Sequence, residues 1–130
     1  MTNYRKYLYP FAAVLLSIAL AACAGTREMT DFSIVGEAPG FEDNVLTLAE
    51  GESNLLGGRA HFDNETTDSV IGALINWSSS DEDEEYVSIA NTGRVTAVSS
   101  TTLLPVPVEI TGRYNGFEDT ITVVVEPSGL

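Results

Sequence analysis

The sequence Val-Pro-Val-Glu-Ile-Thr-Gly-Arg-Tyr-Asn-Gly-Phe-Glu-Asp-Thr-Ile-Thr-Val-Val-Val, residues 106–125, carries the clearest structural signal in the chain. Apolar residues alternate with other residues over 106–111, which is the period of a half-buried β-strand. Asn115-Gly116 favours a two-residue hairpin turn, because both central positions of that turn need positive φ. Residues 120–125 form the returning strand. The side chains expected to face the core are Ile121, Val123 and Val125. This segment therefore predicts a β-hairpin.

Further short strands are predicted on the N-terminal side of this hairpin. They cover residues 45–48, 59–62, 73–77, 86–89 and 94–98. Turns are expected at residues 50–52 and 91–93, where glycine interrupts the apolar pattern. No stretch after Leu20 has helical periodicity. Short, closely spaced strands without helices are typical of an all-β sandwich or small barrel.

Residues 24–43 are rich in turn-forming residues and show little periodicity, so they are interpreted as a linker. A flexible chain of this length would span roughly 25 Å. Phe32, Ile34 and Val35 are apolar, however, and could add an edge strand.

The first 23 residues have the layout of an export signal. Arg5 and Lys6 precede an apolar run over residues 11–20, and Ala21 and Ala22 lead to Cys23. The run is short for a membrane-spanning helix, which needs about 20 residues. Cys23 is the single cysteine, so the sequence excludes an intramolecular disulfide and a cysteine-based metal site.

The segment Leu20-Ala21-Ala22-Cys23 resembles the bacterial lipobox. The resemblance implies a diacylglyceryl group on the Cys23 thiol and cleavage between Ala22 and Cys23, with a signal peptide over 1–22. Because Ala24 rather than Asp follows the cysteine, it also implies the outer membrane in an envelope with two membranes. A plain signal peptide and an uncleaved anchor are the alternatives.

The charge of the chain is strongly negative, with 6 basic and 19 acidic residues. Without Arg5 and Lys6, four arginines remain: Arg27, Arg59, Arg94 and Arg113. Such a surface repels phosphate backbones, so nucleic acid is not expected as a partner. Contact with the membrane is expected through the lipid anchor.

Three segments resemble the bacterial immunoglobulin-like domain, group 2. They are Ile75-Asn76-Trp77-Ser78-Ser79-Ser80-Asp81, then Val87-Ser88-Ile89, then Asn91-Thr92-Gly93-Arg94-Val95-Thr96-Ala97-Val98. The resemblance implies an immunoglobulin-like β-sandwich of about seven strands over residues 44–127. A lipid-anchored linker (23–43) would precede this domain, and a short tail (128–130) would follow it.

The expected core of this domain contains Trp77, Val95, Ile110 and Val123, with the indole of Trp77 buried between the sheets. The chain departs from the family pattern at the acidic residues 82–85 and at the segment 99–105. The resemblance therefore does not define the strand boundaries near Leu103.

Asp81-Glu82-Asp83-Glu84-Glu85 places five carboxylates in a row. Adjacent charges of the same sign repel, so the run requires either an exposed loop or a cation. In an extended conformation Asp81, Asp83 and Glu85 would point the same way and could ligate calcium, which takes 6–8 oxygens. The alternative is a solvated loop, in which Asp81 accepts hydrogen bonds to close the turn after Trp77.

The sequence indicates no catalytic site. His61 is the single histidine and has no evident partners for a triad or a zinc site. The expected protein is thus a non-enzymatic envelope lipoprotein whose domain binds a protein or a glycan. The alternative is a structural accessory subunit of a periplasm-facing assembly.

Overall fold

The computed structural model describes residues 26–37, 39–101 and 103–128. These residues form eleven β-strands and one short 3-10 turn, η1, without an α-helix. The elements are β1 (Met29–Val35), β2 (Phe41–Glu42), β3 (Val45–Leu48), β4 (Ser53–Leu55), β5 (Gly57–Phe62), β6 (Thr67–Val70), η1 (Gly72–Leu74), β7 (Asn76–Ser79), β8 (Val87–Ile89), β9 (Arg94–Ala97), β10 (Val106–Tyr114) and β11 (Phe117–Val125). The prediction of an all-β fold is confirmed.

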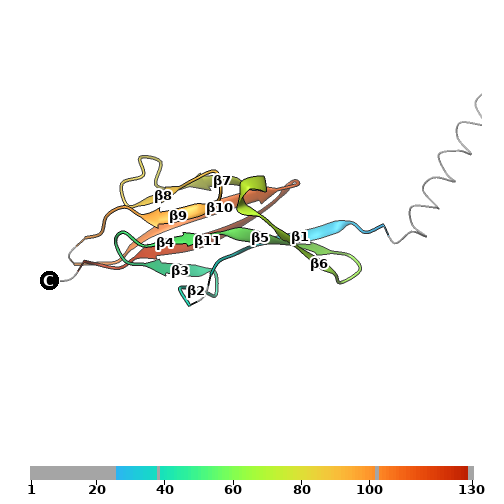
Figure 1. Ribbon diagram of the computed structural model, residues 1–130, viewed down its shortest axis with the longest axis horizontal. Helices are drawn as coiled ribbons and strands as arrows, with labels where there is room; N and C mark the ends of the chain where they lie inside the picture. Colours follow the sequence, from blue (N-terminus) through green and yellow to red (C-terminus); the bar gives the residue numbers. More distant parts are fainter. Residues whose placement is uncertain (1–25, 38, 102, 129–130) are drawn as a thin grey trace, which may run out of the picture.

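The strands form three sheets, with the orders β1-β5-β6, β2-β3-β11-β10-β7 and β4-β9-β8 (Figure 1). All pairs are antiparallel except β3 and β11, which run parallel. The two three-stranded sheets adjoin through the chain itself, because only Leu56 separates β4 from β5.

The predicted hairpin is confirmed. β10 and β11 pair from Val106↔Val125 to Tyr114↔Phe117, which leaves Asn115 and Gly116 as the turn. Their φ angles are 52° and 85°, the positive values that this turn requires. Ile121, Val123 and Val125 are buried, as their alternation predicts.

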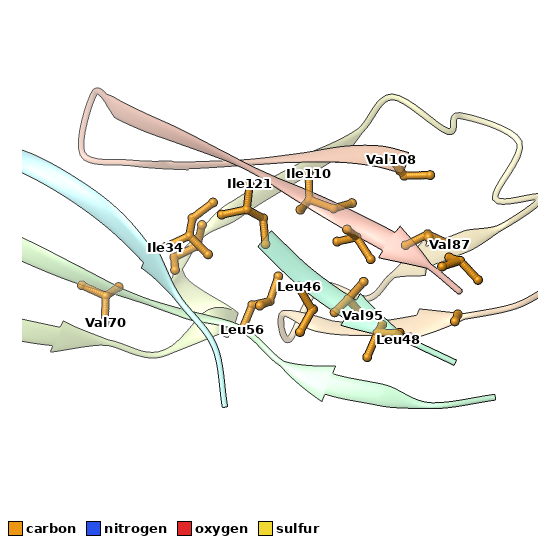
Figure 2. Close-up of a cluster of buried hydrophobic side chains, with 14 of the residues drawn as sticks. Ile34, Leu46, Leu48, Leu56, Val70, Val87, Val95, Val108, Ile110 and Ile121 are labelled. Atoms are coloured by element: carbon orange, nitrogen blue, oxygen red, sulfur yellow. The ribbon is translucent and has the colours of Figure 1, made fainter. Parts of the chain in front are cut away.

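One aliphatic core cluster takes side chains from all three sheets. Figure 2 shows Leu46, Leu56 and Val95 gathered between strands of different sheets. Val95, Ile110 and Val123 are each 0% exposed. Burial of such side chains removes apolar area from water at about 25 cal/mol per Å², and is the main force that holds the sheets together.

Part of the expected linker belongs to the folded body. Met29–Val35 forms β1, which pairs antiparallel with β5, and Phe32 and Ile34 are only 2% exposed. The prediction of a linker over 23–43 is therefore wrong for this segment, and the alternative of an edge strand at Phe32, Ile34 and Val35 is confirmed. Its apolar residues alternate for only three positions, too few to outweigh the glycines and Pro39 that follow, and β5 supplies its partner from a distance.

The boundaries around Trp77 also differ from the expectation. Residues 73–77 are predicted as one strand, but Gly72–Leu74 forms η1 and the strand begins at Asn76. Gly72 permits this turn because the chain passes very close: a Cβ there would lie 2.1 Å from the carbonyl oxygen of Thr92. The eleven described strands likewise exceed the expected number of about seven.

Trp77 lies at the margin of the core rather than at its centre. Its side chain is partly buried and packs against the aliphatic cluster. The indole lies beside Gly93 and Gly112, which have no side chain to displace it, and Nε1 donates a hydrogen bond of 2.9 Å to the carbonyl of Gly72. The prediction that this indole is buried between the sheets is wrong, because aliphatic side chains and Phe32 fill the interior.

Candidate functional site

The acidic loop between β7 and β8 is organised by Asp81. Its Oδ1 accepts a hydrogen bond from the backbone N–H of Glu85 at 3.1 Å. Its Oδ2 accepts bonds from the N–H groups of Tyr86 at 2.8 Å and Val87 at 3.0 Å. These three donors close the loop and fix the start of β8, as the turn-closing interpretation of Asp81 predicts.

The hydrogen bonds also determine the acidity of Asp81. Partial burial of its carboxyl raises the pKa and is the largest single influence, but the N–H groups of Tyr86, Val87 and Glu85 together outweigh it. The pKa of Asp81 is therefore held below its usual value of 3.8. The ionised form is the one that this loop is built around.

The structure does not bring Asp81, Asp83 and Glu85 together as a calcium site. Within residues 26–37, 39–101 and 103–128, no group of three or more His, Cys, Asp or Glu side chains could hold a metal ion. Both oxygens of Asp81 already accept backbone donors. The other four acidic residues of the run are exposed, where water solvates their charge.

His61 lies on β5, with Nε2 3.1 Å from Oγ of Ser33 on the neighbouring β1. This serine–histidine contact is not evident from the sequence, because strand pairing joins residues 28 positions apart. No carboxylate bonds to the imidazole among the described residues, so the third member of a triad is not in place.

The two ends of the elongated body are built from different segments (Figure 1). At one end, Arg27 forms an ion pair with Asp68, and the N–H of Glu28 donates to Asp63. At the other end, the N–H of Ser128 donates to the carbonyl of Thr101. The first described residues and the C-terminal segment therefore lie at opposite ends.

The end that holds the C-terminal segment exposes two leucines that sequence reasoning did not single out. Leu103 is 83% exposed and Leu104 71% exposed. They lie in the segment 99–105, where the sequence departs from the family pattern that its other segments resemble. That departure is the signal that could have identified them. Because contiguous exposed apolar patches mark contact surfaces, these two adjacent leucines are the candidate for such a surface at this end.

A shallow open hollow of about 370 Å³ lies beside β2 and β3. Its lining residues are Pro39, Gly40, Glu42, Asp43, Val45 and Thr47. Two carboxylates and an open mouth do not form a nucleophile–base arrangement, so the hollow suits contact better than chemistry.

Cys23, Ala22 and the rest of the proposed export signal lie outside the described residues. Within the described part of the chain, no helix is long and apolar enough to span a bilayer. No protein-family model matches the chain, and no curated protein matches it either.

Proposed function

We propose that this protein is a non-enzymatic lipoprotein of the cell envelope that presents one immunoglobulin-like β-sandwich as a binding module. The proposal rests on one observation: the start of the described chain and the exposed leucines lie at opposite ends of the body. The described chain begins at one end, beside β1, and the exposed Leu103 and Leu104 lie at the other. A lipid on Cys23 would thus hold the apolar end away from the bilayer.

The order of strand pairing supports the immunoglobulin-like part of the proposal. In such domains one sheet has the order A-B-E-D and the other contains C-F-G. Here β1 pairs with β5, which is continuous with β4, and β4 pairs with β9, which pairs with β8. In the other layer β7 pairs with β10 and β10 with β11. We therefore assign the roles A-B-E-D to the first group of strands and C-F-G to the second, an assignment that the order of the strands along the chain supports.

The lipid anchor rests on the ordered export signal and on Cys23. Acyl chains contribute about 0.8 kcal/mol per buried methylene, so the two or three chains of a bacterial lipoprotein would hold it permanently. β1 begins at Met29, so the tether from Cys23 is only a few residues long. An extended tether of that length spans at most roughly 20 Å.

The partner of the module would be a protein or a glycan at the cell surface. A short tether restricts the module to partners near its own membrane, which also favours the second candidate: a structural accessory subunit of a periplasm-facing assembly. Neither role requires chemistry, and both require an exposed contact surface.

Mass spectrometry of the protein from membranes tests the anchor. We expect an N-terminal cysteine that carries acyl chains, and Cys23→Ser should release the protein from the membrane fraction. An unacylated, uncleaved N-terminus would contradict the proposal. Protease treatment of intact cells then separates the two roles, because a surface module is digested and a periplasmic subunit is protected.

A further inference from the structure

β7 is the outer strand of the five-stranded sheet. It pairs with β10 on one side, and no described strand is hydrogen-bonded to its other side, although β8 of another sheet lies close to it. A strand in this position presents backbone groups that another strand can pair with.

The register identifies these groups. Ser80 donates its N–H to the carbonyl of Glu109 at 2.9 Å, so position 80 is directed toward β10. In an antiparallel pair the direction alternates along the strand. The N–H and C=O groups of Trp77 and Ser79 are therefore directed outward, away from β10.

The edges of three other outer strands, β8, β1 and β6, are closed or charged. On β8, the N–H of Val87 donates to Asp81, and on β1 the N–H of Ile34 donates to Asp119. The outer strand β6 carries Asp68 in its ion pair with Arg27. In contrast, β7 has the sequence Asn-Trp-Ser-Ser, without a charge, a proline or a carboxylate bound to its edge. β7 is short, with four residues, but it carries neither the charged side chains nor the proline by which outer strands commonly prevent pairing.

The charged side chains near β7 favour a partner of opposite charge. The exposed carboxylates of Glu82, Asp83 and Glu84 follow shortly after the end of the strand. Across the sheet, the guanidinium of Arg113 is already paired with Glu118. The local field is therefore negative and favours a cationic segment.

We propose that the β7 edge binds an extended segment of another protein, which adds a strand beside Trp77 and Ser79 and places lysine or arginine side chains against Glu82, Asp83 and Glu84. Backbone hydrogen bonds would provide the affinity, and the basic side chains the selectivity. A second copy of this chain is disfavoured as the occupant, because its acidic loop would add the same charge. The inference rests on the proposed role as a binding module and names the chemistry of its partner.

The test uses the full chain in detergent and a synthetic peptide of alternating valine and threonine with three lysines at one terminus. We expect NMR shift changes at the amides of Trp77 and Ser79, and binding that weakens as salt rises. Two peptides with the lysines at opposite termini report whether the added strand is parallel or antiparallel. A matched peptide with three glutamates should not bind.

Ser79→Pro should reduce the affinity at least about tenfold, because it removes an outward donor without removing a bond to β10. Ser79→Ala is the control. Like the proline variant, it loses the bond from Asp81 N–H to Ser79 Oγ, yet it should bind normally. If Ser79→Pro does not fold, Ser78→Lys provides a second test, since its added charge should repel the basic peptide.

Absence of binding would overturn the inference. It would also be overturned if the NMR shift changes occur away from β7, or if Ser79→Pro binds the peptide with unchanged affinity. Self-association that Ser79→Pro abolishes would instead identify a second copy as the occupant, and this too would overturn it. The peptide experiment does not depend on Cys23. If the peptide does not bind the β7 edge, the proposal of a lipid anchor is unaffected. If Cys23 carries no lipid, the proposal for the β7 edge is likewise unaffected.

Discussion

Asp119 on β11 accepts a hydrogen bond of 2.8 Å from the backbone N–H of Ile34 on β1, across 85 positions of the sequence. The bond joins the first strand of the body to the last. It satisfies an N–H at the edge of β1, while the Ile34 side chain is buried in the core. The segment expected to be a linker is thereby fixed by both its backbone and its side chains.

We expect Ile34→Ala to lower the free energy of unfolding by about 3 kcal/mol, because it leaves a cavity in a packed core. Asp119→Ala should cost about 2 kcal/mol, because it leaves the Ile34 N–H without an acceptor. Urea unfolding followed by the fluorescence of Trp77 measures both. Glu118→Ala is the control, since Glu118 is exposed and its carboxylate bonds to Arg113, which is also exposed. If Glu118→Ala and Asp119→Ala lower the free energy of unfolding equally, the stabilising role of the bond from Ile34 N–H to Asp119 is contradicted.

Asp81→Ala should destabilise the protein by about 2 kcal/mol, because three backbone donors lose a charged acceptor. Asp83→Ala should change stability by less than about 0.5 kcal/mol, because its side chain is exposed. Thermal melts with and without calcium complete the test. A calcium-dependent rise that both variants abolish would restore the metal-site interpretation.

The stabilising effect of Asp81 should depend on pH. Its pKa is lower in the folded protein than the usual 3.8, so its contribution is fully present above that value and is lost as pH falls through the folded pKa. The difference in unfolding free energy between the native protein and Asp81→Asn should therefore be constant near neutrality and shrink in strong acid. If this difference grows on acidification instead, the pKa of Asp81 is raised rather than lowered in the folded protein.

Gly93→Ala should cost more than about 3 kcal/mol, and Gly116→Ala about 1 kcal/mol. Both glycines have positive φ, 93° and 85°. A Cβ at Gly93 would lie 2.4 Å from the carbonyl oxygen of Leu56, whereas one at Gly116 has nothing within 4 Å. The comparison isolates the steric part of the cost, and urea unfolding measures it. Equal costs would show that no close approach exists at Gly93.

The local sequence pattern was sufficient to predict those elements that are formed by residues close together in the sequence. The β10–β11 hairpin depends on an alternation and on Asn115-Gly116, and both are visible in the sequence. The turn-closing role of Asp81 was also predictable, because its partners follow within six positions.

The remaining features depend on residues that are distant in the sequence. The strand at Met29–Val35 needs β5 and Asp119, and the Ser33–His61 contact needs the register of two strands. The position of Trp77 depends on the space that Gly93 and Gly112 leave beside it. None of these partners can be identified from local periodicity.

The sequence by itself determined the strand character, the terminal hairpin and the acidity of the surface, because alternation, turn preference and charge act over a few residues. Only the tertiary structure decided which strands became outer ones and which backbone groups of β7 point away from the sheet. It also decided that the two leucines lie at the end of the body opposite the start of β1. These are consequences of strand order and register, which are set by the packing of all the sheets around one shared core.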